Sequence, residues 1–288
     1  MALHEACLAL RTRQTRMAVV GGTELLLSPD QFIVMSSNGY VTHLAVSPSL
    51  AYIPLISCRM LNSEGKCFTF DSRGSGYGRG EGVATVIVKR LSDAIQDGDN
   101  IHAVIRNSAS NQDGKTNGIT LPSLDAQEAL IRSVYNTAGL DPRDTLYVEA
   151  HGTGTVAGDA AEIKSIGNVF SEHRRDRNLY VGSVKTNLGH TEAASGLAGL
   201  IKAVLVLQKQ QIPPNLNFDK PKPGLDMEQR RITVCSSHRD IDLSSNNMTP
   251  DPSKAGALGP RRPSRPRQSL GQLIWIWWHE LPCHLGAI

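Results

Sequence analysis

The stretch YVEAHGTGTVAGDAAE, residues 147–162, places a histidine directly after a strand-like segment and before a glycine-rich loop. A second stretch, VGSVKTNLGHTEAASG, residues 181–196, repeats this arrangement with His190. In each, an apolar run typical of a buried strand leads to a polar loop and then to a helix start. Parallel α/β sheets gather their chemistry at the carboxyl ends of strands. We therefore predict that His151 and His190 face one pocket, with Lys185 beside them.

Strand and helix patterns alternate along most of the chain, which indicates an α/β layered fold. Strands are predicted at 17–22, 82–91, 101–109, 146–150 and 179–184. The second and third of these are expected to pair as an antiparallel hairpin across the polar turn SDAIQDGDN. Helices are predicted at 1–12, 123–140, 159–170 and 192–208. Ser123 and Gly139 are expected to cap the second helix and Asp159 the third.

Composition narrows the class of protein. The chain has 288 residues, enough for one or two domains, and its formal net charge of +3 is too small to favour a nucleic-acid partner. Its five cysteines show no paired or metal-like spacing, which is typical of free thiols in a reducing compartment. We find no signal peptide and no run near the ~20 apolar residues that span a membrane. These features predict a soluble, cytoplasmic protein that contacts no membrane.

The residues alone leave other interpretations of the two loops open. A single histidine beside a glycine loop is most often an ordinary core or surface residue. A zinc site would lack a convincing third ligand. The GTGTVAG segment lacks the acidic residue that a dinucleotide loop needs about 20 positions later. No serine or threonine stands in a defensible Ser-His-Asp order.

The motifs also resemble those of a known family. VEAHGTGT and VKTNLGHTEAASGLAGLIK resemble the two histidine motifs of β-ketoacyl synthases, most closely those of fungal-type polyketide synthases. Three further segments resemble the same family in the same order: FDSRGSGYGRGEG (70–82), NQDGKTNGITLPS (111–123) and PPNLNFDKPKPGLD (213–226). The resemblance implies a thiolase-like layered αβαβα fold, of which this chain would contain mainly the second half.

The resemblance further implies decarboxylative Claisen condensation of an acyl thioester with a malonyl-carrier thioester. His151 and His190 would be the catalytic histidines, and Lys185 would hold His190 or a carboxylate in place. The residues implied to contact the substrate are Thr153, Thr155 and Asn187. Gly152 and Gly154 would let the backbone pass close to the substrate arm.

No cofactor or metal is expected to bind directly, because the phosphopantetheine belongs to an acyl carrier protein or domain. Intact members of the family are expected to form homodimers. We expect Arg79 and Glu81 to form a structural ion pair.

The family's nucleophile is not found among the cysteines of this sequence. In the family, a Cys-Ser-Ser-Ser-Leu motif precedes a segment like MALHEACLAL, with which this chain begins. Cys7 corresponds to a structural cysteine in that segment. We therefore expect the chain as written to lack condensing activity. The alternative is a non-catalytic remnant that acts as a pairing or carrier-docking module. A thiolase or chalcone-type enzyme is disfavoured by the KTNLGH and NQDG segments.

Two segments depart from the family pattern. Residues 40–59 interrupt a continuous motif, and their ends can be encoded with GTATGT and TGCAG, which are typical of fungal intron boundaries; a genuine loop insertion is the alternative. The WIWW segment (275–278) reads as a glycine-aromatic-glycine-glycine loop after a one-base shift. We therefore divide the chain into the end of the N-terminal half (1–39), a retained-intron insert (40–59), the C-terminal half (60–235) and a frameshifted tail (236–288).

Overall fold

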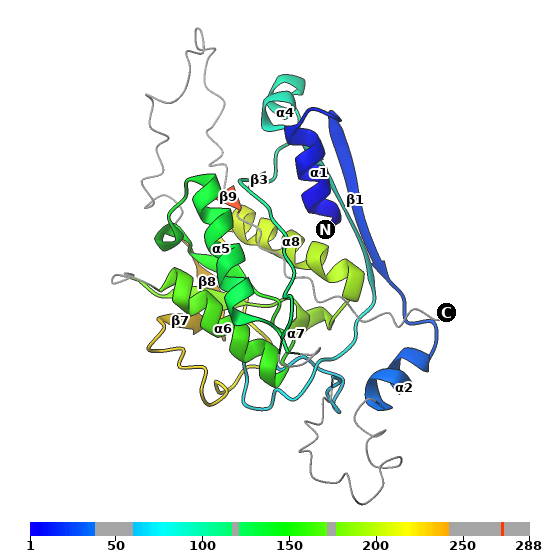
Figure 1. The fold of residues 1–288 in the computed structure, drawn as a ribbon, viewed down its shortest axis with the longest axis vertical. Coiled ribbons are helices and arrows are strands. Elements are labelled where there is room, and N and C mark those ends of the chain that lie inside the picture. Colours follow the sequence, from blue (N-terminus) through cyan, green and yellow to red (C-terminus); the bar gives the residue numbers. More distant parts are fainter. Residues whose placement is uncertain (38–59, 117–120, 172–176, 242–271, 274–288) are drawn as a thin grey trace, which may run out of the picture.

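The computed structural model describes most of the chain (Figure 1). The described residues are 1–37, 60–116, 121–171, 177–241 and 272–273. The insert expected at 40–59 and most of the tail expected at 236–288 lie outside them. Among the described residues, no helix has both the length and the apolar character needed to cross a bilayer.

Two long strands form an antiparallel ribbon with a helix packed on one face. Strand β1 (Met17–Glu24) pairs with β2 (Gly82–Lys89) along their whole length. Helix α1 (Ala2–Arg11) begins the chain, and its buried residues Leu3 and Cys7 share a core cluster with Val20 of β1. Successive side chains of a strand point to opposite faces, so one face of the ribbon enters this core.

Two strands of a three-stranded parallel sheet lead into the two histidine loops. Its order is β4 (Tyr147–Glu149), β5 (Leu179–Gly182) and β7 (Ile232–Val234). Glu149 lies opposite Gly182, so β4 and β5 end at the same edge of the sheet. The chain segments that follow these two strands therefore start side by side.

Helices α5 (Leu124–Ala138) and α6 (Val156–Phe170) cover one face of this sheet. Leu179 and Val181 of β5 are fully buried in the same cluster as the apolar residues of both helices. The rings of Tyr135 and Phe170 meet edge to face, with centroids 5.3 Å apart. Such a pair contributes about 0.5–1.5 kcal/mol beyond the burial of its area.

Helix α8 (Glu192–Lys209) covers the opposite face of the sheet and also contacts the ribbon. Tyr180 of β5 packs in a cluster with Val206 of α8, while Leu197 and Leu200 pack with α1 and β1. A Cβ on Gly22 would lie 2.5 Å from the carbonyl oxygen of Ala193, so the helix and the ribbon are in backbone contact. This position between two layers explains why α8 is apolar nearly all round.

The elements thus stack in four layers: α5 with α6, the parallel sheet, α8 with α1, and the ribbon. None of the described residues covers the outer face of the ribbon. Val19, Val83 and Ile87 are 65, 72 and 68% exposed there.

The hairpin predicted from residues 82–91 and 101–109 is wrong. Residues 91–97 form helix α4 (Leu91–Asp97), which ends at the left-handed Gly98, so the two strands are not joined by a tight turn. Strand β2 pairs instead with β1, and only β3 (Val104–Ile105) forms in the second segment, parallel to β9 (Gln272–Leu273).

The remaining elements are short. They are α2 (Asp30–Ser37), the 3₁₀ turn η2 (Pro142–Asp144), α7 (Lys185–Leu188), β6 (Gln211–Ile212) and β8 (Arg239–Asp240). Strand β8 pairs antiparallel with β6.

The caps predicted for α5 are confirmed. The Ser123 side chain accepts a hydrogen bond from the backbone N–H of Ala126, and Gly139 closes the helix in the left-handed conformation. The Ser123→Ala variant is expected to lower the free energy of unfolding by about 1 kcal/mol, because an orphan N–H loses its acceptor. Urea titration followed by circular dichroism measures this. Ser123→Asp, which keeps an acceptor, is the matched control, and equal losses in both variants would contradict the capping role.

Candidate active site

The two histidines predicted to share a pocket lie together. His151 follows β4 by two residues, and His190 immediately precedes the turn into α8. Their ring centroids are 5.2 Å apart and the rings are nearly perpendicular. Lys185, the first residue of α7 after β5, completes the cluster. The parallel pairing of β4 and β5 therefore produces the proximity that the sequence predicts.

Lys185 contacts His151 rather than His190. Its Nζ lies 3.3 Å from Nδ1 of His151, so the expectation that it holds His190 or a carboxylate needs correction. An ammonium group only donates, and Nδ1 of His151 therefore accepts. The proton of the neutral ring then resides on Nε2. That Nε2 atom is buried and has no hydrogen-bond partner within the described residues.

His190 is held in the same tautomer by the backbone. The N–H of Glu192 donates to Nδ1 of His190 over 3.0 Å, which leaves the ring proton on Nε2. Burial, with smaller contributions from Lys185 and Arg79, lowers the pKa of His190 well below its ordinary value. Burial also lowers the pKa of His151 well below its ordinary value, assisted by Lys185 and His190. Two neutral imidazoles with Nε2–H donors thus occur side by side.

Buried carboxylates shape the glycine loop after His151. Glu162 accepts hydrogen bonds from the backbone N–H groups of His151 and Gly152, at 2.6 and 2.8 Å. Asp159 accepts from Gly154 over 3.0 Å and from Phe70 over 2.7 Å. Burial raises the pKa of Asp159 to about 7 and also raises that of Glu162. Through these two side chains, helix α6 fixes the conformation of the glycine loop.

The role predicted for Asp159 as a helix cap is wrong. Helix α6 begins at Val156, three residues earlier than expected, and Thr155 caps it by accepting from the N–H of Gly158. The cap position is therefore occupied by Thr155, the last threonine of the glycine loop, and Asp159 lies within the first turn of the helix. Asp159 points back to the loop instead.

The three predicted substrate contacts lie in different environments. Thr153 is buried, with its Oγ1 3.1 Å from that of Thr155. Asn187 is exposed on α7, and its Oδ1 accepts from Thr186. Their contact with a substrate remains a prediction.

Arg79 does not pair with Glu81. Its guanidinium lies 2.6 Å from Glu24 and 3.5 Å from Glu192, and its side chain is buried. Glu81 instead accepts from the backbone of Leu26. The Arg79 contacts support the first turn of α8, whose Glu192 N–H fixes the His190 ring.

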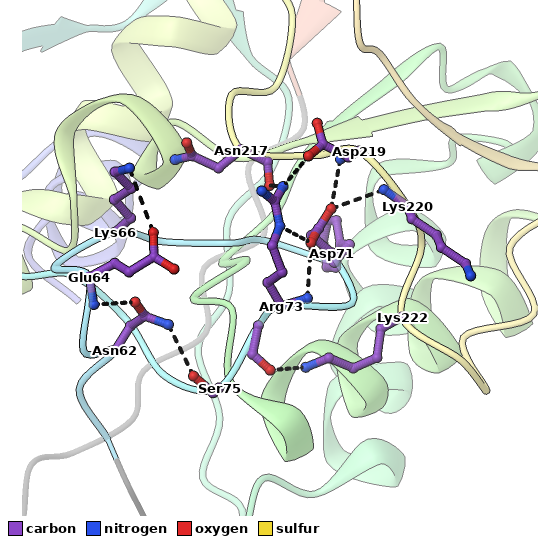
Figure 2. Close-up of polar contacts among 12 residues, drawn as sticks. Asn62, Glu64, Lys66, Asp71, Arg73, Ser75, Asn217, Asp219, Lys220 and Lys222 are labelled. Carbon is purple, nitrogen blue, oxygen red and sulfur yellow. Dashed lines mark hydrogen bonds and ion pairs between the residues drawn. The ribbon is translucent and has the colours of Figure 1, made fainter.

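Two of the family-like segments meet at Asp71 (Figure 2). Its buried carboxylate accepts from the backbone N–H groups of Asp219 and Lys220 and from the Arg73 side chain. The Arg73 and backbone donors hold the pKa of Asp71 well below its usual range, against the opposing effect of burial. Lys222 donates to the carbonyl oxygen of Gly74. These contacts join residues 70–82 to 213–226, and Gly74 packs on the glycine loop at Gly154. Our sequence interpretation missed Asp71 and Lys222, although both lie in the quoted motifs.

A cavity of about 70 Å³ is lined by His151, Lys185 and residues of α5, α6 and α8. Glu149 and Glu162 contribute acidic groups to its lining. Within the described ranges, no group of three or more His, Cys, Asp and Glu side chains is arranged to hold a metal ion.

Two family models match the chain. Residues 102–219 match the model described as beta-ketoacyl synthase, C-terminal domain. Residues 1–52 and 42–94 match the corresponding N-terminal domain in two pieces. The division that we expect at residues 39, 60 and 235 remains a prediction.

Curated relatives include the highly reducing polyketide synthase ltbA of Aspergillus luteorubrus, 52% identical over 235 residues. A highly reducing polyketide synthase of Aspergillus terreus is 53% identical over 236 residues. These matches cover 81 and 82% of this chain but only 7 and 8% of the relatives.

A solved structure supports the same relationship. The ketosynthase from module 6 of the bacillaene synthase of Bacillus subtilis 168 superposes with a TM-score of 0.75 at 37% identity. The match covers 84% of this chain and 40% of that one. The four layers described above therefore belong to the thiolase-like αβαβα arrangement.

Proposed function

The chain belongs to the β-ketoacyl synthase family, in the branch of fungal polyketide synthase ketosynthases, and from this we propose that it supplies the decarboxylating part of a condensing active site. The reaction joins an acyl thioester to a malonyl-carrier thioester. The observation that carries the proposal is the pair of neutral imidazoles, whose ring centroids are 5.2 Å apart and whose Nδ1 atoms are both occupied.

The chemistry uses the two Nε2–H groups as donors. When the bond between the malonyl α-carbon and its carboxylate breaks, carbon dioxide leaves and the electron pair forms an enolate. Negative charge then develops on the thioester oxygen, and two neutral N–H donors aimed at it stabilise it. The enolate carbon attacks the carbonyl of the acyl thioester, and the thiolate of that thioester leaves. The lowered pKa values of both histidines keep the rings neutral at the pH of the cell.

The acyl-carrying thiol is a separate requirement. Nucleophilic cysteines have lowered pKa values and are partly exposed. The described cysteines, Cys7, Cys67 and Cys235, are all buried, and burial raises the pKa of each thiol. Cys58 and Cys283 lie outside the described residues. We propose that none of the cysteines in this sequence holds the acyl group, so this chain decarboxylates without condensing.

The partner in this proposal is an acyl carrier domain that presents the malonyl group on its phosphopantetheine arm. The similarity to highly reducing synthases favours that class of assembly line. Homodimer formation and a cytoplasmic location stay predictions. No observation favours a non-catalytic docking module.

Decarboxylation is tested with the purified chain and malonyl-N-acetylcysteamine. We expect acetyl thioester and carbon dioxide to form faster than in buffer, measured by mass spectrometry, because oxyanion donors alone are worth about 3–4 kcal/mol. A rate equal to that of buffer would refute the proposed role of the histidines.

The absence of an acyl-enzyme is tested in the same preparation with an acyl-N-acetylcysteamine donor. Intact-protein mass spectrometry is expected to show no stable acyl adduct, because no described thiol is activated. A stoichiometric adduct on any of the five cysteines would place the nucleophile within this chain.

A further inference from the structure

A buried ion pair lies behind the histidine cluster. Nζ of Lys202 is 2.9 Å from Oε2 of Glu149, and their side chains are only 10 and 4% exposed. The other carboxylate oxygen, Oε1, accepts the backbone N–H of Val184 over 2.5 Å. The hydroxyl of Tyr147 also donates to Oε2 of Glu149. Every oxygen of this carboxylate is therefore engaged.

The pair joins the three elements that position the active-site cluster. Glu149 is the last residue of β4, two positions before His151. Val184 immediately precedes Lys185, the residue that donates to His151. Lys202 lies on α8, which follows His190. One carboxylate and one ammonium thus connect the end of β4, the residue before α7 and the middle of α8.

The surrounding packing is fitted to this pair. A Cβ on Gly182 would lie 2.9 Å from Oη of Tyr147 and 3.5 Å from Nζ of Lys202. The ammonium also lies 5.6 Å from the centroid of the Tyr147 ring. Burying a carboxylate and an ammonium costs several kcal/mol per ion before they attract each other, so well-packed apolar residues stabilise a fold as well or better. Stability alone therefore does not account for the pair.

We propose that Glu149 and Lys202 are positioning residues, which hold Lys185 against His151 and thereby fix the His151 tautomer. The inference rests on the proposed decarboxylating function. Neither residue touches the substrate in this scheme. The carboxylate accepts a hydrogen bond from the N–H of Val184. This contact fixes the start of α7, whose first residue is Lys185. Lys202 holds the carboxylate in place through the ion pair.

Removing the cation is expected to disturb the site without removing any donor. In a Lys202→Met variant the buried carboxylate has no counter-charge, and an unpaired buried charge is strongly unfavourable where it stands. Its hold on the Val184 N–H weakens, Lys185 moves away from His151, and the ring samples both tautomers. We expect kcat for decarboxylation to fall about tenfold with little change in KM.

Histidine tautomers supply a readout that does not depend on activity. Long-range ¹H–¹⁵N spectra of the labelled chain should show His151 with its proton on Nε2 in the wild type and a mixture in Lys202→Met. Lys209→Met, an exposed lysine on the same helix, is the matched control and should change neither spectrum nor rate. Lys202→Arg should retain the wild-type tautomer, because it restores the cation.

The neutral double variant Glu149→Gln/Lys202→Met guards against a folding defect. Its amide oxygen still accepts from Val184, so we expect it to fold and to recover the Nε2–H tautomer. The proposal is overturned if Lys202→Met keeps the wild-type spectrum and kcat, or if the double variant is no better than the single one. A wild-type chain without decarboxylase activity would refute the proposed function, whereas the spectra would still decide the positioning role.

Discussion

Replacing His190 by alanine is expected to lower the decarboxylation rate about 100-fold or more. The variant removes one of two Nε2–H donors whose orientation is fixed, here by the Glu192 N–H on Nδ1. Loss of a single preorganised oxyanion donor typically costs 10²–10³ in kcat. His151→Ala should lose a similar factor, and the double variant should lose less than the product, because the two donors act on one charge.

The matched control is His102→Ala, which removes an exposed histidine that precedes β3 and contacts Gln208 near the C-terminal end of α8. It should leave the rate unchanged. If His190→Ala retained more than a third of the wild-type rate, the donor mechanism would be excluded.

The pH dependence supplies an independent check on the same histidines. Both pKa values lie well below the ordinary 6.5, so protonation of these two rings should not lower the rate as the pH falls through 6.5. Folding stability behaves differently, because the unfolded chain takes up protons near 6.5 and the folded one does not. The stability that these rings contribute is present above 6.5 and is lost as the pH falls towards their native pKa values.

The Gly152→Ala variant is expected to lower the free energy of unfolding by about 3 kcal/mol. Gly152 has a φ of +48°, which costs an alanine about 1–2 kcal/mol. The added Cβ would also lie 2.5 Å from Cγ2 of Thr69 and 2.7 Å from Cβ of Ser183, and overpacking of this kind costs about 1–3 kcal/mol. Both neighbours are fully buried, so neither can move out into solvent.

Gly139→Ala separates the two contributions. Its φ of +64° is comparable, but nothing lies within 4 Å of a Cβ at that position. This control should lose only the conformational part, about 1–2 kcal/mol. Chemical denaturation of the two variants side by side gives the difference, and equal losses would contradict the steric argument.

Local patterns predicted those parts of the fold that depend on neighbours in sequence. Helix α5 follows from its apolar periodicity and from the capping chemistry of Ser123 and Gly139. The meeting of His151 and His190 follows from a general property of parallel strands. Each inference needs only residues within one or two turns, or one rule of sheet topology.

Pairing between distant segments was not predictable in the same way. The stretch 91–97 contains Leu91, Ala94 and Ile95 at helical spacing, but its polar residues were interpreted as a turn. The true partner of β2 lies some 60 residues earlier, and no local signal specifies it. The same holds for Glu149, whose bond to Val184 spans two elements, and for Asp71. Buried carboxylates find their partners only once the chain has folded.

The ribbon of β1 and β2 has a consequence for how the chain tolerates length changes. It is an eight-residue ladder that closes the loop 25–81, within which the stretch 40–59 falls. The entropy of closing a flexible loop grows only with the logarithm of its length. Deleting twenty residues from this loop would therefore change the closure free energy by roughly 0.4 kcal/mol. A chain with the stretch and a chain without it are expected to form the same β1–β2 pairing with nearly the same stability. The ribbon thus makes this region of the chain permissive to changes in length, so that the histidine layers can form with or without the stretch.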